Sequence, residues 1–408
     1  MKKSYNRKIT LIIVLILIIP VILTGCWSNV DITDIAIATA IGFDMTEEGN
    51  VEFTVQLVKP GVIKAKAQGS QEDTVWIHTG RGDTVLSAIR NLLTTINRKT
   101  FFSHVQLMVI SEEIARRGVM DILDLFERDK ETQKLADLIV SRGLTAREVL
   151  MAHSELENIP SIHIKAIIEN FSDVAKLKKI NLMEIIQCLS CPGYSPAMGV
   201  IKIDPEVSDI EQKDKFSREK SNRIEIKDLS VEGTAVFEKD RLVGWLDAFE
   251  TRGFLFAIDK VKSGIINVPN PLQENKKVAF EIVKSSGKMD VKLKDGDDLQ
   301  LIIEVEVTGK MASQQGRGNL TTPDMIKKLE KEVARVIKKN IQSAVTKAQW
   351  EYRSDIFGFS KKLWKNHNQY WKKIEENWDG IFSTCPVKLK VKSKIVSSSL
   401  TREPTTPN

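Results

Sequence analysis

The chain has 408 residues, of which 42% are hydrophobic and 28% are charged. These values are close to the average of globular proteins, so they exclude a disordered chain and a polytopic membrane protein, and the length allows two or three domains. The net charge is +6, but the chain after residue 25 carries 56 basic and 54 acidic residues. This nearly neutral body gives no support for nucleic-acid binding.

Residues 1–25 have the pattern of a bacterial signal peptide. A basic segment, Lys2 to Lys8, precedes an apolar run from Leu11 to Leu23 that Pro20 interrupts. A helix that spans a bilayer needs about 20 apolar residues, which is more than this run supplies. The pattern therefore favours a cleavable signal over a permanent membrane span.

The signal ends in the lipobox Leu23, Thr24, Gly25 and Cys26, which is an aliphatic residue, two small residues and a cysteine. The small residues suit a peptidase cleft, and the Cys26 thiol can accept a diacylglyceryl group. The motif does not specify whether the amino group of Cys26 is acylated as well. Each buried methylene contributes about 0.8 kcal/mol, so two acyl chains hold a protein firmly. We predict a lipid-anchored lipoprotein; the alternatives are an ordinary signal peptide and an uncleaved anchor.

Strands and helices alternate over residues 26–203, the predicted N-terminal domain. Alternation of apolar and polar residues predicts a strand over 51–57. Thr84 and Ser111 have the residue types that begin helices. Further elements are a strand over 104–110 and helices over 119–128, 145–151 and 162–178. Because the order lacks the regular rhythm of a doubly wound sheet, we predict a multi-domain α+β fold with mixed and antiparallel sheets and packed helices.

The second half begins after a polar segment, 204–223, that we interpret as a charged linker. The C-terminal domain is predicted over 224–396. Its strands are expected over 224–226, 233–237, 242–246, 277–284, 288–293, 299–308 and 387–395, with hairpin turns at Asp240-Arg241 and Gly287-Lys288. A long helix begins after Thr322, whose hydroxyl is expected to cap it, and reaches about residue 353; a second helix covers 360–378. The tail over 397–408 is expected to be disordered.

Two cysteines have C-x-x-C spacing, Cys188 and Cys191. Such a pair can exchange disulfides when a helix runs on from the first cysteine, but Pro192 and Gly193 end any helix here. We therefore favour unreactive cysteines or a local disulfide over a thiol oxidoreductase or a zinc site, and we expect Cys385 to be a free thiol.

The remaining motifs give no catalytic constellation. The five histidines lack metal-ligand spacing, and neither a nucleophile elbow nor a phosphate-binding glycine loop is found. We predict a protein that is not an enzyme, with no catalytic residue, no cofactor and no metal.

Five aromatic residues recur every seven positions near the C-terminus: Trp350, Phe357, Trp364, Trp371 and Trp378. Seven residues make two helical turns, so the rings could form one exposed docking stripe or pack into the core against the long helix. We favour the core, with Gly358 interrupting the helix.

Motifs spread over the whole body resemble the Ger(x)C lipoproteins, the C subunits of GerA-type nutrient germinant receptors of spore-forming bacteria. The residues that carry the resemblance are Gly25-Cys26-Trp27, Asp34-Ile35-Ala36, Ala40-Ile41-Gly42-Phe43-Asp44, Gly82-Asp83-Thr84, Phe102-Ser103-His104, Glu112-Glu113-Ile114-Ala115, Leu125-Phe126-Glu127-Arg128-Asp129, Gly233-Thr234-Ala235-Val236-Phe237, Leu242-Val243-Gly244, Glu250-Thr251-Arg252-Gly253 and Asp355-Ile356-Phe357-Gly358-Phe359. Ser28-Asn29, Ser360 and the two cysteines of the C-x-x-C pair depart from the family pattern.

The resemblance implies two subdomains within 26–203 and a third part at the C-terminus. It also implies a non-enzymatic, lipid-anchored subunit on the outer face of the inner spore membrane. Its partners would be a polytopic B subunit and an A subunit with soluble and membrane domains. A substrate-binding lipoprotein of a transporter is the alternative, but that fold needs two lobes of repeated βαβ units, which the strands over 224–308 do not suggest.

Overall fold

The computed structural model describes residues 13–14, 35–58, 75–129, 133–154, 157–204, 226–294 and 298–398. The predicted lipobox, the linker residues 205–223 and the tail residues 399–408 lie outside these ranges. Within them, no helix combines the length and the apolar character that a membrane span requires.

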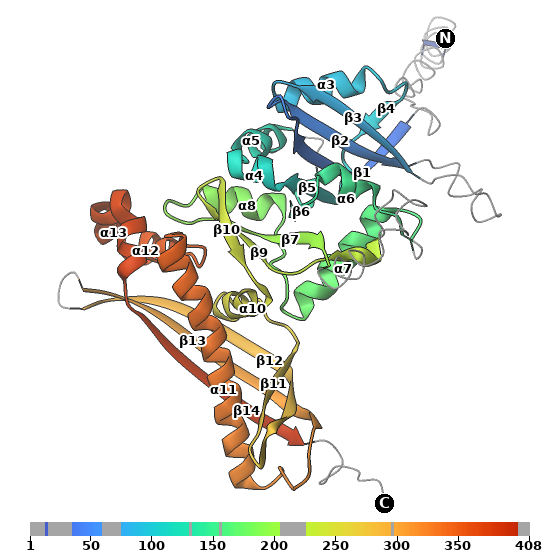
Figure 1. Ribbon diagram of the computed structural model, residues 1–408. Helices are drawn as coiled ribbons and strands as arrows, with labels where there is room; N and C mark the ends of the chain where they lie inside the picture. Colours follow the sequence, from blue (N-terminus) through green and yellow to red (C-terminus); the bar gives the residue numbers. More distant parts are fainter. Residues whose placement is uncertain are drawn as a thin grey trace, which may run out of the picture.

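The described strands form two sheets (Figure 1). The first sheet contains β1 (Ile35–Met45), β2 (Val51–Val58), β3 (Val75–Gly82), β4 (Lys99–Phe101), β5 (Leu107–Ser111), β6 (Asp137–Arg142), β7 (Ala197–Ile203), β8 (Leu229–Ser230), β9 (Thr234–Glu238) and β10 (Arg241–Leu246). The second contains β11 (Ile265–Asn270), β12 (Gln273–Lys294), β13 (Asp298–Gln314) and β14 (Val387–Ser398). These two sheets and the helices that pack on them confirm the predicted α+β class.

The first sheet has a parallel centre with antiparallel edges. Its order is β10-β9-β7-β6-β5-β1-β2-β3. The four central strands, β7, β6, β5 and β1, run parallel to one another. One face packs on α3 (Val85–Leu93), α4 (Glu112–Arg117), α5 (Met120–Arg128) and α8 (Leu182–Leu189), and the other on α6 (Ala146–Met151) and α7 (Pro160–Asp173). Helices on both faces explain why β2 is buried along its whole length.

The second sheet is an antiparallel meander, β11-β12-β13, to which β14 adds in parallel. The long predicted helix is confirmed as α11 (Pro323–Thr346), which lies along this sheet in Figure 1. The other helices of this half are α10 (Ala248–Ala257), α12 (Phe359–Asn366), α13 (Asn368–Ile374) and α14 (Trp378–Thr384), with a 3-10 turn at Glu375–Asn377 and a π-helical turn at Lys347–Glu351. Another 3-10 turn, Ile226–Asp228, directly precedes β8 and packs on the first sheet.

The first sheet continues past the predicted linker. After it, β8 and β9 both pair with β7, and β10 pairs with β9. Residues 229–246, which the sequence places in the C-terminal domain, thus belong to the first sheet, and the second sheet begins only at β11. Alternation identified β9 and β10 as strands, but it carries no information about which strand is their neighbour.

One predicted hairpin turn is wrong. Gly287 lies inside β12, which is continuous from Gln273 to Lys294, whereas the turn near Asp240 does join β9 to β10. A Cβ atom at Gly287 would lie 2.1 Å from the Phe256 carbonyl oxygen of α10. The glycine is therefore needed for close packing rather than for a turn.

The helices differ from the prediction at their ends. Ser111 and Thr84 accept hydrogen bonds from backbone N–H groups as expected of caps, but the Thr322 side chain makes no such bond. The long helix gives way to the π-helical turn after Thr346, and the predicted helix over 360–378 is divided among α12, α13 and the start of α14.

The core interpretation of the aromatic repeat is confirmed for Phe357, Trp371 and Trp378, which are at most 2% exposed. Trp371 and Trp378 meet edge to face with 5.5 Å between ring centroids. Trp350 and Trp364 are instead 76% and 45% exposed. As predicted, Gly358 interrupts the helix, because its positive φ of 82° marks the beginning of α12.

Gly253 sets how closely α10 and α11 approach, because a Cβ atom there would lie 2.0 Å from the Asn340 carbonyl oxygen. Gly253→Ala should lower the free energy of unfolding by roughly 1–3 kcal/mol through overpacking, although alanine favours helix by about 1 kcal/mol. Urea denaturation measures this, with Gly380→Ala as the control, since Gly380 is exposed in α14 and faces only the flexible Asn377 side chain. A Gly253→Ala protein as stable as the wild type would contradict the close-approach explanation.

Candidate functional site at the junction of the two sheets

The two sheets meet at the turn before α12, and Asp355 organises this turn. The Asp355 side chain is fully buried. Its Oδ1 accepts hydrogen bonds from the N–H groups of Gly358 (2.8 Å) and Phe359 (3.2 Å), and its Oδ2 accepts one from Ser360 (2.7 Å). One carboxylate thus satisfies three N–H groups at the start of α12 that have no partner within the helix.

Burial shifts the pKa of the Asp355 carboxyl group. Desolvation raises the pKa of Asp355 to about 6, although its three backbone hydrogen bonds act in the opposite direction. Asp44 shows the same balance in the first sheet, where its oxygens accept from Ala146 (2.6 Å) and Arg147 (2.9 Å) at the start of α6 and burial raises its pKa to about 6.

The same turn connects to the first sheet. The Ser195 N–H donates to the Asp355 carbonyl oxygen (3.2 Å), and the Ser354 hydroxyl donates to the carbonyl of Phe237 in β9. The Tyr352 hydroxyl donates to the Trp245 carbonyl (2.9 Å) and accepts from the Trp245 N–H (3.0 Å) in β10. Residues 352–360 therefore contact two strands of the first sheet and the loop before β7.

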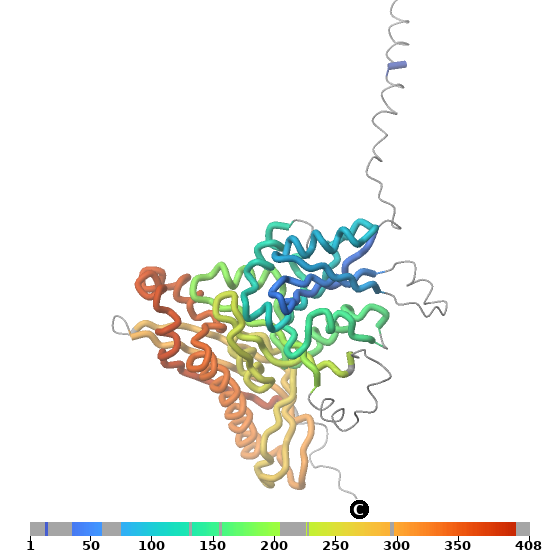
Figure 2. The backbone as a smooth tube through the Cα atoms, turned by 45° about the horizontal axis from the view of Figure 1, so that its top comes forward, coloured from blue at the N-terminus to red at the C-terminus, as the bar shows by residue number. Residues whose placement is uncertain are grey.

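That loop docks on the C-terminal helices through Gly193. Its φ of 72° favours glycine, and a Cβ atom there would lie 2.6 Å from Trp378 Cδ1 and 2.8 Å from Trp371. In Figure 2 the red C-terminal helices lie beside the green segment that contains α8 and this loop. The Trp371 and Trp378 rings thus form part of the contact between the two halves.

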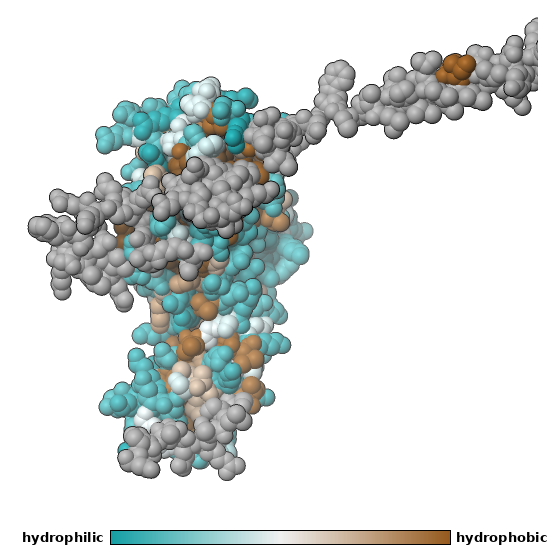
Figure 3. All heavy atoms as spheres, turned by 90° about the vertical axis from the view of Figure 1, so that its right-hand side faces the viewer, coloured by the Kyte–Doolittle hydropathy of each residue, from teal (hydrophilic) through white to brown (hydrophobic). Residues whose placement is uncertain are grey.

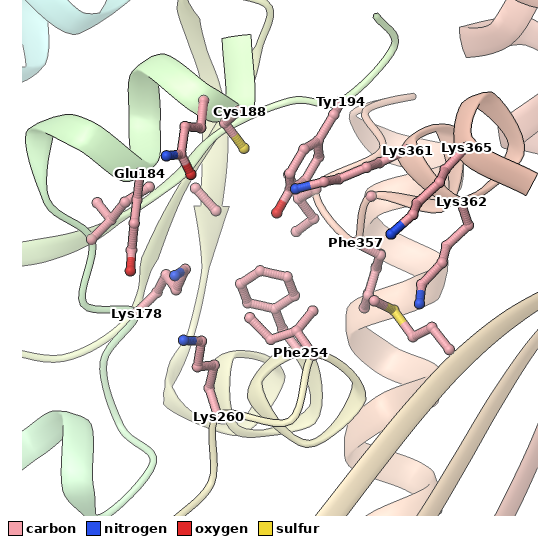
Figure 4. A pocket seen from close by; sticks show the side chains of 17 residues that line it. Lys178, Glu184, Cys188, Tyr194, Phe254, Lys260, Phe357, Lys361, Lys362 and Lys365 are labelled. Carbon is pink, nitrogen blue, oxygen red and sulfur yellow. The ribbon is translucent and has the colours of Figure 1, made fainter. Parts of the chain in front are cut away.

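A cleft of about 410 Å³ opens at this junction, between α8, α10, β12 and α12 (Figure 4). We call it the lysine cleft, since its charged lining consists of one acidic residue, Glu184, and five lysines: Lys178, Lys260, Lys361, Lys362 and Lys365. Figure 4 shows Lys178 and Lys260 on one side and the three lysines of α12 on the other. The uncharged part of the lining includes the apolar side chains of Phe254, Met289 and Phe357 and the polar side chains of Gln187 and Tyr194.

Lys178 is the buried lysine of the cleft, with 8% of its surface exposed. Its Nζ donates to the Lys179 carbonyl (3.0 Å). Burial lowers the pKa of Lys178; the negative charge of Glu184 acts against this shift, and the positive charge of Lys260 adds to it. Among the described residues, no carboxylate lies within ion-pair distance of any of the five lysines. The sequence did not predict this cleft, because its lysines come from segments about 180 positions apart.

The C-x-x-C pair lies next to the cleft without forming a disulfide. Cys188, Cys191 and Cys385 are free thiols, as expected for Cys385, and α8 ends at Leu189 as Pro192 and Gly193 indicated. Burial raises the pKa of Cys188 to about 12 and that of Cys385 to about 11, so neither forms a thiolate readily. The described residues contain no group of three or more histidine, cysteine, aspartate or glutamate side chains suited to a metal ion.

The predicted lipidation residues, Leu23, Thr24, Gly25 and Cys26, lie outside the described residues. The first described strand, β1, begins at Ile35, nine positions after Cys26.

Comparison with known proteins matches both halves of the chain. Residues 28–203 match the family model for the spore germination protein N-terminal domain, and residues 232–399 match the one for the spore germination B3/GerAC-like C-terminal domain. The chain belongs to the Ger(x)C family of spore germination proteins. Its role is therefore connected with germination.

Individual relatives extend over nearly the whole chain. Spore germination protein KC of Bacillus subtilis (strain 168) is 25% identical over 403 residues, which cover 97% of each chain. Spore germination protein B3 of the same organism is 22% identical and covers 92% of this chain and 94% of its own. The crystal structure of the GerBC protein shares the fold, with a TM-score of 0.55, 19% identity and coverage of 88% of this chain and 97% of that one.

Several motifs that carry the family resemblance lie at the junction. Asp355 to Phe359 form the turn described above. In α10, Glu250 forms an ion pair with Lys347 (3.0 Å), and the Thr251 hydroxyl lies 3.0 Å from that of Thr234 in β9. These motifs therefore contribute to the contact between the two sheets.

The buried Asp355 carboxyl predicts a pH dependence of stability. The pKa of Asp355 is about 6 in the folded protein and about 3.8 in the unfolded chain, so protonation of Asp355 favours the folded state. This contribution to the free energy of unfolding is fully present below pH 3.8 and is lost as the pH rises through 6. Asp355→Asn does not titrate, so the difference in unfolding free energy, wild type minus variant, should fall between pH 4 and pH 7 by up to about 3 kcal/mol. Urea denaturation over this range tests it, and a difference that grows with pH would contradict it.

Proposed function

We propose that the protein is a lipid-anchored, non-enzymatic subunit of a nutrient germinant receptor, and that it acts by assembly with polytopic A and B subunits. The observation that carries the proposal is the match of both family models, in order, across nearly all of the chain beyond Cys26. The lipobox supplies the anchor, and the expected location is the outer face of the inner spore membrane.

The end of the first sheet nearest to Cys26 along the chain suits a position close to a membrane. Eight residues lie between Cys26 and Ile35, so the two positions can be at most about 30 Å apart. Ile35 pairs with Lys99, whose ammonium lies 5.2 Å from the Phe101 ring centroid, and the Arg98 guanidinium lies 5.4 Å from that of Trp76. Basic and aromatic side chains favour the anionic interfacial layer of a bilayer.

The described titratable groups support a role without catalysis. The buried carboxylates of Asp44 and Asp355 are occupied by backbone N–H groups, and the buried thiols have raised pKa values. The antiparallel meander β11-β12-β13 of the second sheet also speaks against the transporter alternative, because that fold needs a second lobe of repeated βαβ units.

The anchor is tested in spores that carry the wild type, a deletion or Cys26→Ala. The deletion should abolish the response to some nutrients while leaving a receptor-independent trigger effective, and Cys26→Ala should reduce the same responses, because the protein leaves the membrane fraction. Release of dipicolinic acid and the amount of protein in washed membranes are the two readouts.

Cys191→Ser is the matched control, because it also removes a thiol but leaves the lipobox intact. It should germinate like the wild type, and the double variant Cys188→Ala, Cys191→Ser should do so too if thiol exchange plays no part. Normal germination with every nutrient in both the deletion and Cys26→Ala would contradict the proposed function.

A further inference from the structure

We propose that the lysine cleft binds a small soluble organic anion that carries two or more negative charges on an apolar body. The proposal rests on the cleft alone and not on the receptor function proposed above. Three features carry it: the unbalanced charge of the lining, the burial of Lys178 and the apolar floor.

The charge of the lining is strongly one-sided. Five lysines face one carboxylate, Glu184, although the chain beyond residue 25 as a whole is nearly neutral. The other polar side chains at the cleft do not reduce this imbalance, because burial raises the pKa of both Cys188 and Tyr194 and keeps them uncharged. Like charges on facing walls repel each other, and an anion between them removes this repulsion.

Lys178 points to a ligand rather than to a structural role. An ammonium group has three N–H donors, and the protein supplies an acceptor for one of them, the Lys179 carbonyl. The charge of Glu184 offsets part of the cost of this buried charge but forms no ion pair with it, and an apolar side chain of similar length would avoid that cost. An anion in the cleft provides both the missing charge and the missing acceptors.

The floor of the cleft sets the chemical class of the ligand. Phe254 and Phe357 line the cleft although they are only 1% and 2% exposed, and the half-buried Met289 adds a thioether; inorganic phosphate would leave this apolar lining unused. A volume of about 410 Å³ is typical of sites for small organic molecules, which combine an apolar lining with a few polar groups. Polycarboxylates and organic phosphates meet these requirements.

Binding would also connect the two sheets. Lys178 lies shortly before α8 of the first sheet, whereas Lys260 follows α10 and the other three lysines belong to α12. An anion held by both walls strengthens the junction, so its binding is expected to raise the melting temperature of the protein.

The test titrates the full chain, in phosphatidylcholine nanodiscs, with phthalate, citrate and inorganic phosphate. Calorimetry gives the affinities and tryptophan fluorescence gives the melting temperatures. Phthalate is expected to bind more tightly than citrate, which lacks an apolar body, and more tightly than phosphate, and to raise the melting temperature. Lys178→Met and the double variant Lys361→Glu, Lys365→Glu should each weaken binding at least tenfold.

The double variant Lys372→Glu, Lys373→Glu is the matched control, because it reverses the same charge on exposed residues of α13 outside the cleft. It should bind like the wild type. Three results would overturn the proposal. They are an equal loss of affinity in this control, unchanged affinity in the cleft variants, and no binding of either organic anion to the wild type. Occupation of the cleft in phosphatidylglycerol nanodiscs alone would also overturn the proposal, since it would identify a lipid headgroup as the ligand.

Discussion

The need to satisfy buried backbone N–H groups at the start of α12 is the constraint on which the junction depends. These groups face protein instead of water, and Asp355 supplies both of its oxygens to them. Its own carbonyl then accepts from Ser195, and the adjacent Ser354 reaches β9. The turn therefore fixes the start of α12 and its attachment to the first sheet at the same time. Its sequence, Asp355 to Phe359, is also part of the family resemblance, which agrees with a role in holding the fold.

Close approach at two glycines completes this arrangement. Gly253 lets α10 lie against the backbone of α11, and Gly193 lets the loop before β7 lie against Trp371 and Trp378. The lysine cleft is bounded by elements that these contacts position, so the two glycines help to set its shape. The face shown in Figure 3 is mostly hydrophilic, with small groups of hydrophobic side chains between the polar ones.

Local rules predicted the elements that depend on neighbouring residues. The β2 strand, the caps at Thr84 and Ser111 and the long α11 follow from periodicity and from side-chain hydrogen bonding within a few residues. Gly287 was misinterpreted because a glycine signals both turns and close packing, and only the position of α10 distinguishes the two. The placement of β9 beside β7 and the gathering of Lys178 with Lys361 depend on contacts far apart in sequence, which no local pattern contains. The lipobox at Cys26 remains a prediction, since it lies outside the described residues.

Hydrogen exchange of the full chain, followed by mass spectrometry, tests the central claim that the Asp355 turn holds the two sheets together. The comparison is between the wild type and Asp355→Ala at a pH and temperature where both are folded. The account predicts faster exchange in residues 354–366 and also in residues 190–200, which lie more than 150 positions earlier, with β2 unchanged as an internal reference. Faster exchange confined to residues 354–366 would show that the turn stabilises only its own helix, and it would contradict the account.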